Sequence, residues 1–172
     1  VVNTTNAPTA RLDNFGLTLL NDLTIQAGAV FNANTLNVNI AGDLINLNVT
    51  GTTGTAVGGY RPGSTTQTTT FNSSTSNQLI TGTATPNRTN FANLVINNTF
   101  GSVTLSANTA VTVNSELTLT NGILADGSNI IRVLGNVSNS ATHSGSGKIF
   151  LNGATQHTIS GSGSGIFENI EL

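Results

Sequence analysis

Carboxylates are the first side chains to test for chemistry, because an enzyme that cleaves polysaccharide on a repetitive β scaffold needs two of them in one groove. Glu168 and Glu171 form the nearest pair, but their odd separation directs them to opposite faces of a strand. Asp22 and Asp43 lie about one coil apart, so stacking could bring them together. The remaining acidic residues are isolated: Asp13, Asp126 and Glu116. We therefore expect solvated corner carboxylates and a protein that is not an enzyme.

Metal-ligating groups are equally sparse. The segment 126–129 (Asp-Gly-Ser-Asn) supplies one carboxylate, so a Ca²⁺ ion held by Asp126 and corner carbonyls stands as an alternative to a solvated corner. The two histidines, His143 and His157, have no partner at a metal-ligand spacing. His157 shares strand parity with Ile159, and we expect it to be a hydrogen-bonded structural imidazole. The sequence predicts no metal and no cofactor.

Tyr60 and Arg61 form the one aromatic–cation pair that we expect at the surface. They are predicted to contact a ligand, and the alternative is a loop anchor that packs on the rest of the molecule. Seven Phe, one Tyr and no Trp are few aromatic residues for a sugar-stacking platform. No Ser lies in a nucleophile-elbow phrase, and no Gly-rich stretch carries a phosphate-loop Lys.

The elements that must position these residues are repeated. The phrase FNSSTSNQLITG (71–82) returns about 79 residues later as FLNGATQHTISG (150–161). Two further pairs of phrases are FANLVI with FENIEL (91–96 and 167–172) and LTIQAGAVFNANTLNV with LTLTNGILADGSNIIRV (23–38 and 117–133). Long-period similarity of this kind is typical of stacked-repeat proteins, and we expect the chain to be a segment of a larger array.

Apolar and polar residues alternate over short spans, which predicts strands with one face inward. In the segment 45–49, for example, Ile45, Leu47 and Val49 are predicted inward, around Asn46 and Asn48. No segment shows amphipathic helical spacing over three turns, so the sequence predicts an all-β chain. The residues predicted to form the buried core are Leu23, Ile25, Leu36, Val38, Leu94, Ile96, Val103, Leu105, Val111, Val113, Leu117, Leu119, Ile131 and Val133.

The connections between the short strands indicate how the strands pair. Asn, Gly and Ser clusters mark corners, because Asn and Gly tolerate left-handed backbone conformations. The corners are too open for two-residue hairpins, and helices for crossover connections are missing. A parallel β-solenoid, right-handed, satisfies both conditions, with each strand pairing with its equivalent one turn later. At about 20 residues and about 4.8 Å per turn, we expect seven to nine turns and a rod of about 40 Å.

We expect one continuous solenoid segment over residues 1–172, divided by the repeat. A partial copy spans 1–70, a full copy 71–149 and a second partial copy 150–172. Within the first copy, residues 51–70 are rich in Gly and poor in inward-type residues, so they are predicted to form an irregular protruding loop.

Composition restricts the partners. Charged residues make up 7% of the chain and the formal net charge is −2, so we expect no nucleic-acid binding. No apolar run is long enough to span a bilayer, so we expect no membrane insertion in this segment. The absence of Cys excludes disulfides, and a surface rich in Thr, Asn and Ser favours an extracellular, cell-surface location.

Three phrases resemble the repeat regions of giant secreted surface adhesins of the Bacteroidetes: FANLVINN (91–98), SVTLSANTAV (102–111) and LTLTNGIL (117–124). The resemblance covers most of residues 15–172. It implies cargo of type IX secretion, with the secretion machinery as a partner, and display at the cell surface in the manner of SprB-type gliding-motility adhesins.

These observations lead us to expect a non-catalytic stalk or adhesive filament segment of such an adhesin. The alternative is a binding module whose rod face or 51–70 loop contacts a glycan or another external surface. A polysaccharide-degrading β-helix enzyme is the remote alternative, and it would require a groove lined with carboxylates.

Overall fold

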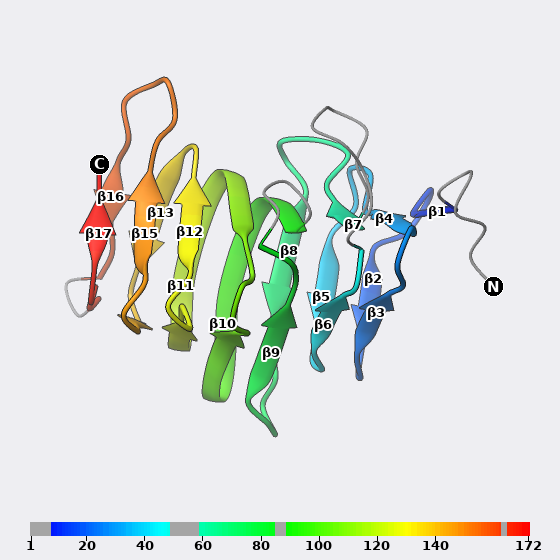
Figure 1. The fold of residues 1–172 in the computed structure, drawn as a ribbon, viewed down its shortest axis with the longest axis horizontal. Helices are drawn as coiled ribbons and strands as arrows, with labels where there is room; N and C mark the ends of the chain where they lie inside the picture. Colours follow the sequence, from blue (N-terminus) through cyan, green and yellow to red (C-terminus); the bar gives the residue numbers. More distant parts are fainter. Residues whose placement is uncertain (1–7, 49–58, 85–88, 163–164) are drawn as a thin grey trace.

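The computed structural model describes residues 8–48, 59–84, 89–162 and 165–172, and within them the regular structure is β-strand without any helix. All pairings between these strands are parallel. Figure 1 shows the turns stacked along one axis, with β1 and β17 at opposite ends. The chain is therefore a parallel β-solenoid of about seven turns, as predicted from the short alternating strands.

The strands form three parallel ladders, which we number in chain order. Ladder I contains β1 (Thr9–Arg11), β4 (Val30–Asn32), β7 (Gly59–Arg61), β12 (Ile130–Val133), β15 (Lys148–Leu151) and β17 (Ile170–Glu171). Ladder II contains β2 (Leu17–Leu19), β5 (Val38–Ile40), β8 (Thr68–Phe71), β13 (Asn136–Asn139) and β16 (Ile159–Ser160). Ladder III contains β3 (Leu23–Ile25), β6 (Leu44–Asn46), β9 (Gln78–Thr81) and β14 (Thr142–Ser144).

Two long strands run through all three ladders. β10 (Thr89–Leu105) pairs with β7, β8 and β9 on the preceding turn, and β11 (Val111–Ala125) pairs with β12, β13 and β14 on the following turn. β10 and β11 also pair with each other, with register shifts where the chain bends from one ladder to the next. The corners use the expected residue types, since Asn34 and Asn108 take the left-handed conformation with φ of 56° and 58°.

The core is the column enclosed by the ladders, and most of the predicted inward residues line it. Of the predicted set, all but Leu23 and Leu36 are buried. Leu23 is half-buried because the first described turn has a paired neighbour on one side only, and Leu36 is half-buried at a corner before β5. Alternation with period two therefore identified the inward face of the ladders correctly.

The predicted parity is wrong for residues 45–48, and Val49 lies outside the described residues. Asn46 and Asn48 are fully buried, while Ile45 is half-buried and Leu47 is exposed. Pairing with neighbouring turns fixes the register: Leu44 lies between Leu23 and Ile80, which places it inward and Ile45 outward. The buried amides are satisfied, because Asn46 Nδ2 donates to Thr89 Oγ1 at 3.0 Å and Asn46 Oδ1 accepts the Asn48 N–H at 3.1 Å.

The prediction of an irregular loop over 51–70 is wrong for the strands inside it. Residues 59–61 form β7 and residues 68–70 belong to β8, both in register with the turns on either side. Residues 51–58 lie outside the described residues. The Thr-rich sequence of β8 concealed this strand, because Thr69 is fully buried and takes an inward position where alternation calls for an apolar residue.

The repeated phrases do not stack on their own copies. Phe71 lies in β8 on ladder II, whereas its counterpart Phe150 lies in β15 on ladder I. Leu94 of ladder II corresponds to Ile170 of ladder I in the same way. The third pair of phrases moves from ladder III at 23–25 to ladder II at 117–119. Each later copy thus begins one ladder earlier, so the long sequence repeat falls one third of a turn short of a whole number of turns.

Candidate functional site

The expected exposure of Tyr60 is wrong. Its side chain is fully buried, stacked on Phe31 with ring centroids 5.4 Å apart and tilted against Phe91 at 5.1 Å. The hydroxyl lies 2.6 Å from Thr69 Oγ1, and burial raises the pKa of this hydroxyl. Tyr60 therefore occupies the position of the anchor that we kept as the alternative. Its neighbour Arg61 points outward from β7 and is half-buried, and its contact with a ligand stays a prediction.

Stacking brings Asp22 and Asp43 together, as the one-coil spacing allowed. Asp22 Oδ1 accepts the backbone N–H of Asp43 at 2.8 Å, and Asp43 Oδ1 accepts that of Leu79 at 2.8 Å. Three Asn side chains make the same bond to the backbone of the next turn, in the pairs Asn37 with Thr68, Asn77 with Ser102 and Asn136 with Thr158. We call these bonds corner brackets. In these bonds the carboxylates of Asp22 and Asp43 accept backbone N–H groups and so join consecutive turns.

Asp126 and His143 form a pair that the sequence analysis missed. Both side chains are fully buried, with Asp126 Oδ2 3.1 Å from His143 Nε2. Burial lowers the pKa of His143, and the Asp126 carboxylate opposes part of that effect. The backbone passes close to the carboxylate at Gly145, where φ is 118° and a Cβ would lie 2.3 Å from Asp126 Oδ1. Asp126 and His143 lie about one turn apart in the sequence, as Asp22 and Asp43 do, so this spacing is the signal that could have revealed the pair.

The surroundings of Asp126 do not fit the calcium alternative. Its Oδ1 already accepts the backbone N–H groups of Ser128 and Gly147, each at 2.8 Å, and its Oδ2 faces an imidazole nitrogen. Ca²⁺ needs six to eight oxygen ligands, and N–H donors compete for the only carboxylate of this corner. Across the described ranges, no group of three or more His, Asp or Glu side chains could hold a metal ion.

His157 is a structural imidazole, as predicted. Its Nε2 accepts the backbone N–H of Gly153 at 3.1 Å, which leaves Nδ1 to donate to the Gly135 carbonyl oxygen at 2.5 Å. Both nitrogens are therefore used to connect backbone segments. The ring has no free nitrogen to offer a metal or a substrate.

The basic side chains gather on one ladder. Arg11, Arg61, Arg132 and Lys148 all lie in strands of ladder I, and the fifth basic residue of the chain, Arg88, lies outside the described residues. Two of the four are balanced by carboxylates, because Arg11 pairs with Asp13 at 2.5 Å and Lys148 pairs with Glu171. The Arg132 guanidinium lies 5.4 Å from the centroid of the Phe150 ring, and Lys148 Nζ lies 6.0 Å from it.

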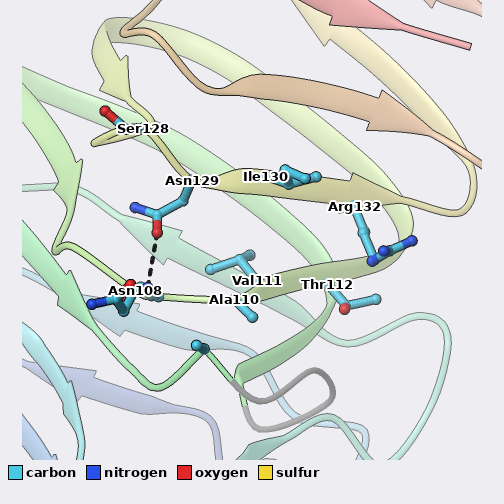
Figure 2. Close-up of a pocket in the computed structure, with 10 residues that line it drawn as sticks. Asn108, Ala110, Val111, Thr112, Ser128, Asn129, Ile130 and Arg132 are labelled. Carbon is cyan, nitrogen blue, oxygen red and sulfur yellow. Dashed lines mark hydrogen bonds between the residues drawn. The ribbon is translucent and has the colours of Figure 1, made fainter.

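Two clefts flank Ile130, where the chain enters ladder I. The first, of about 270 Å³, is lined by Asn108, Thr112, Ser128 and Arg132 among others, and Figure 2 shows Ile130 and Arg132 on β12 beside Val111 and Thr112 on β11. The second, of about 390 Å³, is lined by Ser146, Lys148, Asn169 and Glu171 among others. Together with Phe150 they combine a cation, an aromatic ring and several hydroxyl and amide groups on one outer face.

No protein-family model matches this chain, and no curated protein or solved structure is significantly similar to it. Within the described residues, no helix has the length and hydropathy needed to cross a membrane.

Proposed function

We propose that this chain is a non-catalytic spacer segment in the stalk of a large cell-surface adhesin, where the stacked turns hold a binding region away from the cell. The observation that carries the proposal is the continuity of the ladders. From β1 to β14, each turn pairs with the next on all three ladders. A rod of this kind has no intrinsic limit on length, because each turn requires only a neighbour of matching shape.

The corner brackets support the same proposal. They supplement the three ladders with hydrogen bonds between turns at several corners. For example, Asp22 Oδ1 accepts the Asp43 N–H, Asp43 Oδ1 accepts the Leu79 N–H, and Asn37 Oδ1 accepts the Thr68 N–H. Tension along the rod axis acts on the hydrogen bonds between turns, so parallel sets of such bonds share the load. The extracellular location and the secretion route rest on the resemblance and the composition described above.

The enzyme alternative receives no support from the placement of the carboxylates. Of the seven carboxylates, Asp22 and Asp43 accept backbone N–H groups, Asp126 is buried, and Asp13 and Glu171 form ion pairs, which leaves Glu116 and Glu168. A glycosidase of the ordinary kind needs two carboxyl groups about 5–9.5 Å apart on either side of an open groove. The binding alternative is favoured by the basic side chains on the outer face of ladder I.

The spacer proposal predicts that function follows turn number. Deleting residues 111–130 removes one turn in register, because Val111 pairs with Ile131 and Leu117 with Val137. The shortened protein should fold and be about 4.8 Å shorter, as measured by small-angle scattering. On a surface-displayed adhesin, deletions and duplications of this turn should change the reach of attachment in proportion to turn number. A deletion of residues 111–120 is the matched control, because it breaks the register and should prevent folding.

Attachment that is independent of turn number would contradict the spacer role. If, in addition, a single outer side chain such as Arg61 or Arg132 proved necessary for attachment, the segment would be a binding module instead of a spacer.

A further inference from the structure

The outer face of ladder I differs from the rest of the described surface in charge. Every described Lys and Arg lies on this ladder, and the described strands of ladders II and III carry none. The whole chain has a net charge of −2, so the concentration of cations on one face is a local feature. A face of one sign raises the local concentration of ligands of the opposite sign.

Register places these side chains in one outer column. Arg61 lies next to Asn90 one turn later, and Thr112, Arg132 and Phe150 follow on successive turns. Arg61 and Arg132 are three turns apart, or about 14 Å at about 4.8 Å per turn. Neither has a carboxylate partner among the described residues, whereas the guanidinium of Arg132 is positioned over the Phe150 ring.

The two clefts beside this column add hydroxyl and amide groups to the cations. Thr112, Ser128 and Asn108 offer hydroxyl and amide groups on one side of Ile130, and Ser146 and Asn169 offer them on the other. Ile130 itself is 42% exposed and Phe150 is partly exposed, so apolar surface lies between the polar groups. We define the Arg132 site as Thr112, Ile130, Arg132, Lys148 and Phe150.

From this arrangement we infer that the Arg132 site binds an acidic polysaccharide, with Arg132 donating to a sugar carboxylate and Phe150 and Ile130 packing against the sugar ring. A guanidinium matches the planar carboxylate geometrically, and its five N–H donors can reach the carboxylate and a neighbouring hydroxyl together. Hydroxyl and amide side chains suit a polyol. This inference is independent of the spacer role, because a stalk with or without a lateral binding site would keep the same ladders.

The charge pattern favours a glycan over the other anionic polymers. Nucleic acid carries a phosphate on every residue and is held by many cations in succession, whereas this column has two unpaired arginines three turns apart. An acidic glycan in which carboxylates alternate with neutral sugars needs only widely spaced cations.

Glu171 should weaken the binding of an acidic ligand, which is the opposite of the effect expected of Arg132. Its carboxylate pairs with Lys148 and lies on the same outer column as Arg132, two turns away. It therefore opposes the approach of a second carboxylate. Neutralising it should strengthen binding, whereas neutralising Arg132 should weaken it.

The test is calorimetric titration of the 172-residue chain with a polygalacturonate oligosaccharide, with neutral dextran, single-stranded oligo(dT) and anionic phospholipid vesicles as competing ligand classes. We expect binding to the polygalacturonate alone, weakened when salt is raised from about 0.01 M to about 1 M, which shortens the Debye length from about 30 Å to about 3 Å. Arg132→Ala should raise the Kd about fivefold or more, and Glu171→Gln should lower it about twofold.

Arg11→Ala is the matched control, because Arg11 is an exposed cation of ladder I whose charge is balanced by Asp13 and which lies outside the Arg132 site. It should leave the Kd unchanged. The melting temperature of Arg132→Lys is measured beside that of the parent. If the two are equal, weaker binding by this variant reflects a lost contact and not lost folding. Absence of salt-sensitive binding to polygalacturonate, an equal effect of Arg132→Ala and Arg11→Ala, or tighter binding to oligo(dT) or vesicles would each overturn the inference.

Discussion

The turns before β10 and the turns from β10 onward build the same three ladders from different cores. In the earlier turns the strands are three or four residues long, and the core contains Tyr60 and Phe71 together with buried amides such as Gln67 and Gln78. In the later turns β10 and β11 run through all three ladders around an aliphatic core, and the buried polar groups include the ionisable pair Asp126 and His143.

The comparison shows that the ladders do not require one type of core. Each turn contacts only its neighbours, so an aromatic turn and an aliphatic turn can follow each other if their shapes match where they meet. Phe91, in the first part of β10, makes that junction, since it packs on both Tyr60 and Phe71. Substitutions in the two parts should therefore fail by different mechanisms.

The largest effect is expected in the aliphatic part. Leu119 is 1% exposed, and Leu119→Asp would place an unpaired carboxylate in an apolar column, which should lower the free energy of unfolding by more than about 4 kcal/mol. Thr118 is the matched control, because it is on the outer side of the same strand, and Thr118→Asp should cost under about 1 kcal/mol. Urea unfolding measures both, and equal losses would contradict the assigned alternation.

A smaller but still large effect is expected in the aromatic part. Tyr60→Ala removes a ring that packs on Phe31 and Phe91, and it should lower the free energy of unfolding by about 3–5 kcal/mol. Tyr60→Phe keeps the ring and loses the hydroxyl, which bonds to Thr69, so it should cost about 1 kcal/mol. If Tyr60→Ala were tolerated as well as Tyr60→Phe in thermal unfolding, the aromatic junction would not be the core of these turns.

The sequence predicted the fold class and most of the core because alternation is a local property of each strand. Leu117 and Leu119 flank a Thr on one strand, and both are buried as predicted. The predictions of burial fail where pairing with the neighbouring turns sets which residues point inward. Asn46 is inward because Leu44 is held between Leu23 and Ile80, and Tyr60 is inward because β7 is held between β4 and β10.

In the candidate site, too, the features set by local sequence could be predicted and those set by the stacking of turns could not. The approach of Asp22 to Asp43 could be predicted from their separation of about one coil, and His157 could be predicted to be structural from its strand parity. The collection of Arg61, Arg132 and Lys148 on ladder I could not, because it depends on how many residues each corner contains. Corner lengths set which ladder a residue joins, and a repeat that is one third of a turn short places copies of one phrase on different ladders.

The Asp126–His143 pair of the later turns predicts that the protein is less stable in acid. The folded protein disfavours the charged imidazole, which faces Asp126 and, at longer range, Glu168. Below the ordinary His pKa of about 6.5, the unfolded chain binds a proton that the folded chain does not, so stability should fall as pH decreases from about 7 to about 5. His143→Gln should reduce this pH dependence of the melting temperature. If the melting temperature of His143→Gln depended on pH as that of the parent does, protonation of His143 would not be the cause of the acid sensitivity.

The smallest effect is expected at a corner bracket of the first turns. Asp22 Oδ1 accepts the N–H of Asp43, so Asp22→Ala removes one hydrogen bond between turns and should cost about 1 kcal/mol at this exposed corner. Asp22→Asn keeps the acceptor oxygen and matches the brackets of Asn77 and Asn136, so it should cost a few tenths of a kcal/mol. Hydrogen exchange at the Asp43 amide is the sharper measurement, because protection there depends on the bracket itself. Equal exchange rates in the Ala and Asn variants would mean that the bracket adds nothing to the ladder, and that the load between turns rests on backbone pairing alone.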